Sequence, residues 1–117
     1  MSEKAETSIT RKCLRYLQDS GGDGFHVHGS MYQRPNEPDI DGSIFYNGRW
    51  LHLKIEVKTP WGKPTPMQVY RLKEYAKRGY ITGIVTSVEE LQEVIENARE
   101  NAVWTRQGYL QVSGSDG

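Results

Sequence analysis

The sequence has little of what builds disulfide-rich, zinc-binding or membrane proteins. Its one cysteine, Cys13, excludes an internal disulfide and a cysteine-rich zinc site. No apolar run approaches the length of a membrane span, and residues 1–4 are polar where a signal peptide needs an apolar core. We therefore expect a cytoplasmic protein without a membrane segment, in which Cys13 fills space on the buried side of a helix.

Charge is also absent as a global signal, because the formal net charge is zero. The charges are nevertheless unevenly spread: basic residues dominate between 49 and 78, and glutamates dominate between 87 and 100. A basic middle and an acidic distal helix suit a protein that presents one face to phosphates. Two solvated helices of unlike charge would produce the same pattern, so the asymmetry alone does not decide.

With 117 residues the chain is long enough for one core, and we expect a single domain over residues 1–117 with a disordered tail at 113–117. Apolar periodicity and turn residues predict the order α-β-β-β-α-β-α. The expected elements are a helix over 3–19, strands over 25–32, 39–46 and 49–58, a helix over 65–78, a strand over 80–86 and a helix over 87–101. Because β-α-β crossovers are right-handed, the last strand should lie parallel to the one before it. The predicted fold is α/β, with a mixed four-stranded sheet flanked by helices.

The predicted hairpin in the middle of the chain carries the strongest chemical signal. Asn47-Gly48 is typical of a tight two-residue turn, and antiparallel pairing of the flanking strands places Asp39 near Glu56. Because polar and apolar residues alternate along the second strand, Glu56 and Lys58 share its non-aliphatic face. Two carboxylates and an ammonium group should therefore converge at the open end of the hairpin.

These groups have the chemistry that phosphodiester hydrolysis requires. Mg²⁺ prefers oxygen ligands and usually takes only one or two of them from protein carboxylates. Asp39 and Glu56 can supply those, and the carbonyl of Val57 can add a third oxygen. Lys58 can orient the attacking water or stabilise negative charge on the phosphoryl group. The alternative is a surface aspartate beside a salt-bridged Glu-Lys pair, which is the common origin of an isolated E-x-K triplet.

The motifs that identify a family are Pro38-Asp39, Glu56-Val57-Lys58 and Gln68, in this order of elements. They resemble the PD-(D/E)xK nuclease superfamily and, more narrowly, its VRR-NUC (virus-type replication-repair nuclease) family. The resemblance covers residues 6 to about 95, and its most specific segment reads E-V-K-T-P-x-G-K-x-(S/T)-x-x-Q. It implies a restriction-endonuclease-like core.

The resemblance also implies roles for individual residues. Asp39 and Glu56 would bind Mg²⁺ or Mn²⁺, and Lys58 would be catalytic. Gln68 would support the site, and Glu6 would be the acid of the first helix. Small stand-alone relatives are similar to Holliday-junction resolvases, so a homodimer that acts on branched DNA is implied as well.

Some of these positions have other interpretations. Gln68 is also what a capping box needs at the third position of a helix. Glu3 rivals Glu6 from a neighbouring face of the helix, and the helix dipole favours acids in the first turn in any case. Relatives often have a small residue before Pro-Asp, where this chain has Asn36-Glu37, and this departure predicts a different loop before the strand.

Side chains outside the motifs are candidates for contacts with DNA, as phosphate clamps or stacking residues. They are Tyr32, Gln33, Arg34, Trp61, Lys63 and Arg71. Packing of the tryptophan in its own loop and solvation of the cations is the ordinary alternative. The tail carries Trp104, Tyr109 and Leu110, which we expect to pack on the protein's own core or on a two-fold partner.

Two functions of different class follow. The first is a Mg²⁺- or Mn²⁺-dependent endonuclease that cuts branched DNA as a homodimer. The second is a catalytically silent module that binds DNA structures within a repair or replication assembly. The joint presence of Asp39, Glu56 and Lys58 favours the first, because a pure binding protein gains little from an acidic cluster that faces phosphate.

Overall fold

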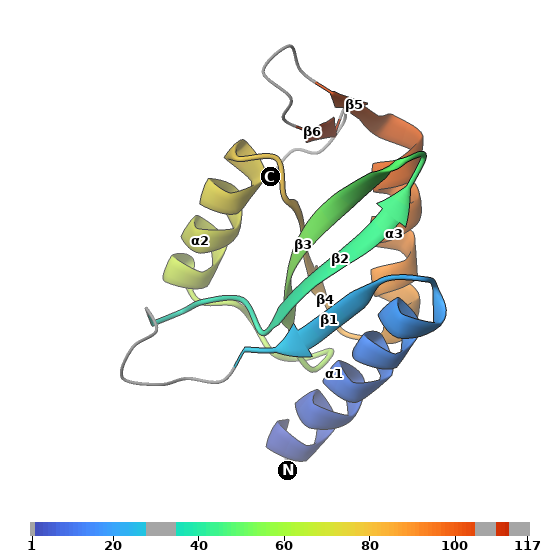
Figure 1. Ribbon diagram of the computed structural model, residues 1–117. Coiled ribbons are helices and arrows are strands. Elements are labelled where there is room, and N and C mark those ends of the chain that lie inside the picture. Colours follow the sequence, from blue (N-terminus) through green and yellow to red (C-terminus); the bar gives the residue numbers. More distant parts are fainter. Residues whose placement is uncertain (1, 28–34, 105–109, 113–117) are drawn as a thin grey trace.

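The computed structural model describes residues 2–27, 35–104 and 110–112. Four strands form one mixed sheet in the order β1-β2-β3-β4, in which β3 and β4 are parallel and the other neighbours are antiparallel (Figure 1). The elements are α1 (Ser2–Asp19), β1 (Asp23–His26), β2 (Ile40–Tyr46), β3 (Arg49–Val57), α2 (Pro66–Lys77), β4 (Ile81–Val85), α3 (Val88–Asn101), β5 (Ala102–Trp104) and β6 (Leu110–Val112). The predicted α/β fold and the parallel last strand are confirmed.

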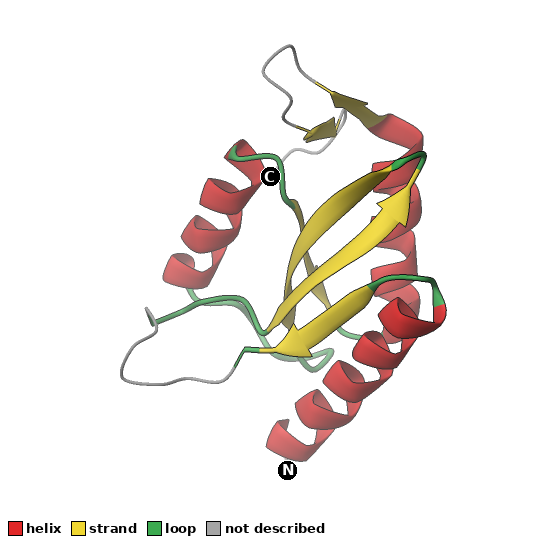
Figure 2. Cartoon of the chain, viewed as in Figure 1, coloured by secondary structure: helices red, strands yellow, loops and turns green. Residues whose placement is uncertain are grey.

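Helices cover the two faces of the sheet unequally. Helices α1 and α3 lie on one face, and α2 lies on the other (Figure 2). The hydrophobic core is between the sheet and the α1–α3 layer, and its members include Cys13, Leu17, Ile40, Ile44, Leu51, Leu53, Ile55, Val57, Ile81, Val85, Leu91 and Ile95. Burial of each large aliphatic side chain contributes on the order of 1.5–3 kcal/mol. Helix α2 therefore covers the opposite, polar face of the sheet.

Strand β3 follows the predicted alternation. Its aliphatic residues point into the core, as their near-zero exposure shows. Lys54 and Glu56 point to the opposite, α2-facing side, because side chains along a strand alternate between faces. None of the helices in the described ranges is long and apolar enough to cross a membrane.

The turn between β2 and β3 is the predicted two-residue hairpin. Asn47 and Gly48 both have positive φ, 54° and 84°. This is the conformation that a tight turn matching the sheet twist requires, and asparagine and glycine tolerate it best. The turn sets a register in which Ile40 lies opposite Ile55.

The first strand begins earlier than predicted. Strand β1 covers Asp23–His26 rather than starting at Phe25, and residues 28–32 of the expected strand lie outside the described ranges. The glycine-rich run after α1 brings the backbone against the sheet. A Cβ at Gly22 would lie 2.2 Å from the carbonyl oxygen of Ser43, which only glycine allows.

The C-terminal segment contains a strand pair that the sequence did not predict. Strands β5 and β6 pair antiparallel in a separate two-stranded sheet. The predicted helix over 87–101 is confirmed as α3, and β5 follows it directly. Tyr109 and the tail at 113–117, which we expected to be disordered, lie outside the described residues.

Candidate active site

The hairpin register brings Asp39 to the end of β3. Asp39 lies just before β2, one position beyond the Ile40–Ile55 pair. Its Oδ2 accepts a hydrogen bond of 2.8 Å from the backbone N–H of Val57. The next amide, that of Lys58, points the other way and donates to Val85 of β4. The Asp39 carboxylate thus replaces the strand partner that Val57 lacks, because β2 begins only at Ile40.

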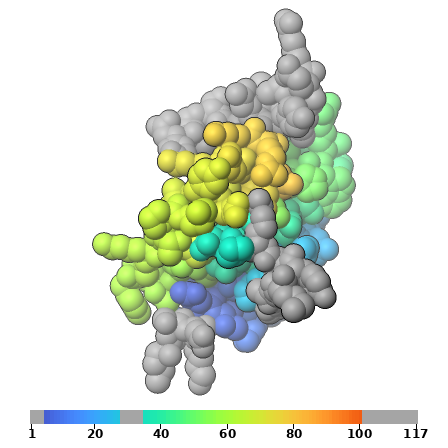
Figure 3. All heavy atoms as spheres, turned by 90° about the vertical axis from the view of Figure 1, so that its left-hand side faces the viewer, coloured from blue at the N-terminus to red at the C-terminus, as the bar shows by residue number. Residues whose placement is uncertain are grey.

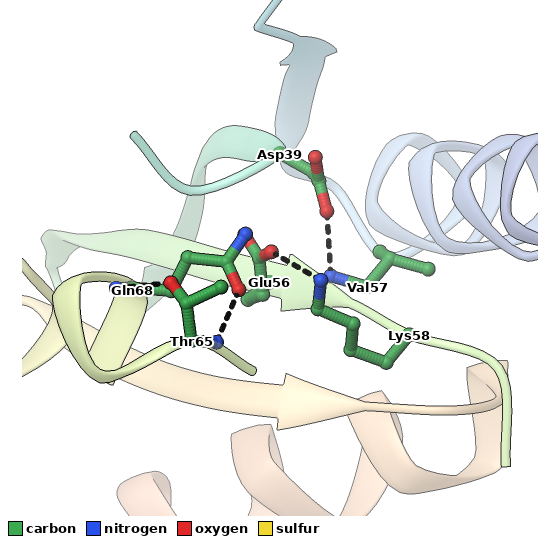
Figure 4. A network of polar contacts seen from close by, with 6 residues as sticks. All are labelled: Asp39, Glu56, Val57, Lys58, Thr65 and Gln68. Atoms are coloured by element: carbon green, nitrogen blue, oxygen red, sulfur yellow. Dashed lines mark hydrogen bonds and ion pairs between the residues drawn. The ribbon is translucent and has the colours of Figure 1, made fainter. Parts of the chain in front are cut away.

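Glu56 is a buried carboxylate on the α2-facing side of the sheet. The residue is 2% exposed. Its Oε2 lies 3.5 Å from Nζ of Lys58, whose side chain is 16% exposed. Its Oε1 is buried and has no hydrogen-bond partner among the described residues. Asp39, Glu56 and Lys58 therefore meet around the last residues of β3 (Figure 4).

The protonation of Glu56 reflects this environment. Burial raises the pKa of Glu56 from its ordinary value of 4.5 to about 7, the negative charge of Asp39 acts in the same direction, and Lys58 opposes both. A carboxylate that is removed from water without full compensation binds a proton more tightly for this reason. A divalent cation would supply the missing positive charge.

The donor set fits a hard cation. A buried oxygen without a partner, a second carboxylate from Asp39 and the nearby backbone of Val57 offer oxygen ligands, which Mg²⁺ and Mn²⁺ accept. Within the described ranges, no three side chains of the types His, Cys, Asp and Glu form a metal-binding group. The described site therefore offers the carboxylates of Asp39 and Glu56, and a role for Glu6, which is half-buried on α1, stays a prediction.

Of three comparisons with known proteins, the one with solved structures found a similar protein. No protein-family model matches the sequence, and no curated protein matches it. A solved structure described as "VRR_NUC domain" is similar, with 25% sequence identity and a TM-score of 0.63. The match covers 79% of this chain and 95% of that chain. The chain thus shares the fold of a VRR-NUC domain. The family suggested by the sequence motifs is thus confirmed.

Gln68 forms the capping box of α2 together with Thr65. Its backbone N–H donates to Thr65 Oγ1 at 3.1 Å, and its Oε1 accepts from the backbone N–H of Thr65 at 2.9 Å. Its carboxamide nitrogen is not used by the cap and is turned toward the Glu56 side (Figure 4). The cap interpretation is therefore confirmed, and the supporting role in catalysis stays a prediction.

A pair of variants separates these roles. Thr65→Ala and Gln68→Ala each break the capping box, and we expect each to lower the free energy of unfolding by about 1 kcal/mol. If Gln68 also supports the site, Gln68→Ala should lower DNA cleavage about tenfold more than Thr65→Ala does. Thermal unfolding and cleavage rates measured side by side check this. Equal cleavage by the two variants would leave Gln68 only as a cap.

The residues proposed to contact DNA differ in how they are placed. Trp61 lies on a turn closed by a hydrogen bond from Gly62 N–H to the Thr59 carbonyl. Its side chain is 80% exposed, so it does not pack in its own loop. Lys63 is exposed in the same loop. Arg71 is mostly buried and pairs with Glu37. Tyr32, Gln33 and Arg34 lie outside the described residues.

A group of polar residues that the sequence did not predict lies beside the site. Four residues lie between α2 and the sheet. They are Glu37, Tyr75 and the ion pair of Lys54 with Asp41, in which Nζ lies 2.6 Å from Oδ2. The available signal was the charged Glu37 directly before Pro38-Asp39. It was treated as a departure from the motif and not as a contact.

Proposed function

We propose that this VRR-NUC domain hydrolyses phosphodiester bonds in DNA with Mg²⁺ or Mn²⁺ as cofactor. At the level of its family the chain is a nuclease domain. The observation that carries the finer proposal is the buried Glu56 carboxylate, which has a free oxygen next to Asp39 and Lys58. Such an arrangement is costly for the fold unless a cation binds it, and sites of this kind cluster where chemistry takes place.

Each residue has a role that follows from its position. Asp39 and Glu56 would hold the cation through their carboxylates, with the carbonyl of Val57 as a third oxygen. When bound, the cation supplies charge stabilisation for the phosphoryl oxygens and lowers the pKa of coordinated water. Lys58, on the same strand end, would orient the attacking water or stabilise negative charge on the phosphate.

The substrate is proposed to be branched DNA, cut by a homodimer. The resemblance to small stand-alone relatives similar to Holliday-junction resolvases supports this, since two sites related by a two-fold axis match a junction with two-fold symmetry. Trp61 and Lys63 are exposed in the loop that follows Lys58 and are suited to stacking on bases and to binding phosphate. Cytoplasmic location remains the expectation from the sequence.

The deciding experiment is cleavage of labelled four-way junction, flap and duplex DNA with Mg²⁺, Mn²⁺ or EDTA, together with a solution mass. We expect metal-dependent cuts in the junction, none in EDTA, and the mass of a dimer. Activity that survives EDTA would remove the metal mechanism. A monomer that cuts duplex equally well would remove the branched-DNA and dimer proposals.

Asp39→Asn tests the metal ligand. Asparagine keeps an oxygen that can accept the hydrogen bond from Val57, so we expect the fold to persist. Loss of the charge should weaken Mn²⁺ binding by about 10- to 100-fold and tighten DNA binding, because a negative charge that faces phosphate is removed. Calorimetric Mn²⁺ titration and a DNA-binding assay measure both effects. A variant that cuts at the wild-type rate would show that Asp39 is not a ligand.

A further inference from the structure

The residue before the Pro-Asp motif is tied to helix α2. The hydroxyl of Tyr75 donates a hydrogen bond to Glu37 Oε1. Nε of Arg71 lies 3.7 Å from Glu37 Oε2, and the two side chains are only 19% and 17% exposed. Figure 3 shows the segment before β2 lying directly against α2 on this face. We call Glu37, Arg71 and Tyr75 the Glu37 anchor.

The anchor is built from rigid parts. Arg71 and Tyr75 are four residues apart on α2 and so lie on the same helix face. The ring of Tyr75 is itself held by an edge-on contact with Tyr80 at 5.0 Å and by the Lys54 ammonium at 4.7 Å. A hydroxyl on a packed ring gives Glu37 a partner in a set position, and a carboxylate this far buried needs such partners.

The connection from Glu37 to Asp39 has little freedom. Pro38 between them is buried, and its ring holds φ near one value. Before Glu37 the chain turns at Asn36, whose φ of 66° lies in the left-handed region that asparagine tolerates. On its far side Asp39 is held by Val27, whose N–H donates to the Asp39 carbonyl. A displacement of Glu37 is therefore transmitted to the Asp39 carboxylate.

We propose that the Glu37 anchor positions Asp39 for metal binding, with Glu37 and Tyr75 as positioning residues that touch neither metal nor DNA. This rests on the proposed function, in which Asp39 is a ligand. Helix α2 presents an arginine and a tyrosine that receive the Glu37 carboxylate. Groups that orient ligands in this way typically change metal affinity 10- to 100-fold when removed.

The test uses Tyr75→Phe, which removes the hydroxyl and keeps the packed ring, with Tyr70→Phe on the exposed side of the same helix as matched control. The first readout needs no metal: hydrogen exchange of the Val57 amide, which reports the bond from Val57 to Asp39. We expect exchange at Val57 to rise about tenfold in Tyr75→Phe, with the amide of Leu53 in mid-strand unchanged. Tyr70→Phe should change neither.

The second readout is Mn²⁺ affinity. Tyr75→Phe should bind Mn²⁺ about tenfold more weakly, and excess Mn²⁺ should restore its cleavage rate. Glu37→Gln approaches the anchor from the other side and should raise exchange at Val57 in the same selective way. Unchanged exchange at Val57 in both variants would overturn the proposal. An equal rise at Leu53 and Val57 would overturn it too, because it would mean general loosening.

These outcomes are separable from failure of the nuclease proposal. A wild-type protein that binds Mn²⁺ and cuts no DNA would contradict the proposed function. The anchor would still be decided by amide exchange and by the Mn²⁺ affinities of the variants. If the wild type bound no Mn²⁺, selective exchange at Val57 alone would decide whether the Glu37 anchor holds Asp39.

Discussion

Lys58→Ala is expected to lower DNA cleavage by about 10²- to 10⁴-fold, the range found when a group that moves a proton or stabilises transition-state charge is removed. Its ammonium lies 3.5 Å from a Glu56 oxygen at the end of β3, and the side chain is largely enclosed. Such a group acts on the reacting atoms and contributes little to the contacts that hold the rest of the DNA. Binding of junction DNA should therefore be largely retained.

The measurement is single-turnover cleavage beside DNA binding, at saturating Mn²⁺. Lys63→Ala is the matched control, because it removes an exposed lysine from the loop that follows. We expect this control to weaken DNA binding modestly and to lower its salt dependence. If Lys58→Ala lost binding and cleavage in equal measure, Lys58 would be a phosphate-binding residue and not a catalytic one.

The second large effect concerns Glu56, whose ionisation should destabilise the metal-free fold. In the folded state its pKa is about 7, against an ordinary value of 4.5. Between these pH values the folded protein binds more protons than the unfolded chain, so stability falls as pH rises through this window and levels off above it. A difference of this size corresponds to about 3 kcal/mol.

Glu56→Gln removes the charge and should reverse this cost. At pH 8 in EDTA we expect the variant to be more stable than the wild type by up to about 3 kcal/mol, or roughly 10 °C in Tm. At pH 4 the two should be similar, because the wild-type carboxyl is then protonated. Metal-dependent cleavage should be lost, as when a fold gains stability at the expense of its site.

Thermal unfolding between pH 4 and 8, with and without Mn²⁺, measures this. Added Mn²⁺ at pH 8 should raise the Tm of the wild type and leave that of Glu56→Gln nearly unchanged. Glu96→Gln, an exposed glutamate on α3, is the control and should show wild-type behaviour. A wild-type free energy of unfolding that stays constant from pH 5 to 8 in EDTA would contradict the proposal that ionised Glu56 destabilises the metal-free fold.

Much of the site could be predicted because it depends on local rules. Asn47-Gly48 determines the turn, the turn determines the register, and the register places Asp39 beside Glu56. The two-residue period of the strand then places Glu56 and Lys58 on the same face. The helix start at Thr65 was readable for the same reason, since a capping box involves only neighbours in sequence.

Other features depended on contacts between distant segments. Charge alone suggested a DNA contact for Arg71, but α2 turns this arginine toward Glu37. The hydrogen bond from Tyr75 to Glu37 joins residues 38 positions apart, and no periodicity reports such a pair. The separate β5–β6 pair was missed because three-residue strands carry almost no alternation to detect.

The sequence by itself determined the order of elements from α1 to α3, the hairpin and the set of residues that meet at its end, because turn chemistry and side-chain alternation act over a few positions. Only the tertiary structure decided how deeply Glu56 is buried and which of its oxygens has no partner. It alone placed α2 over the polar face of the sheet, and with it the tyrosine and arginine that receive Glu37. Burial and long-range pairing depend on how whole elements pack, and packing is a property of the assembled layers.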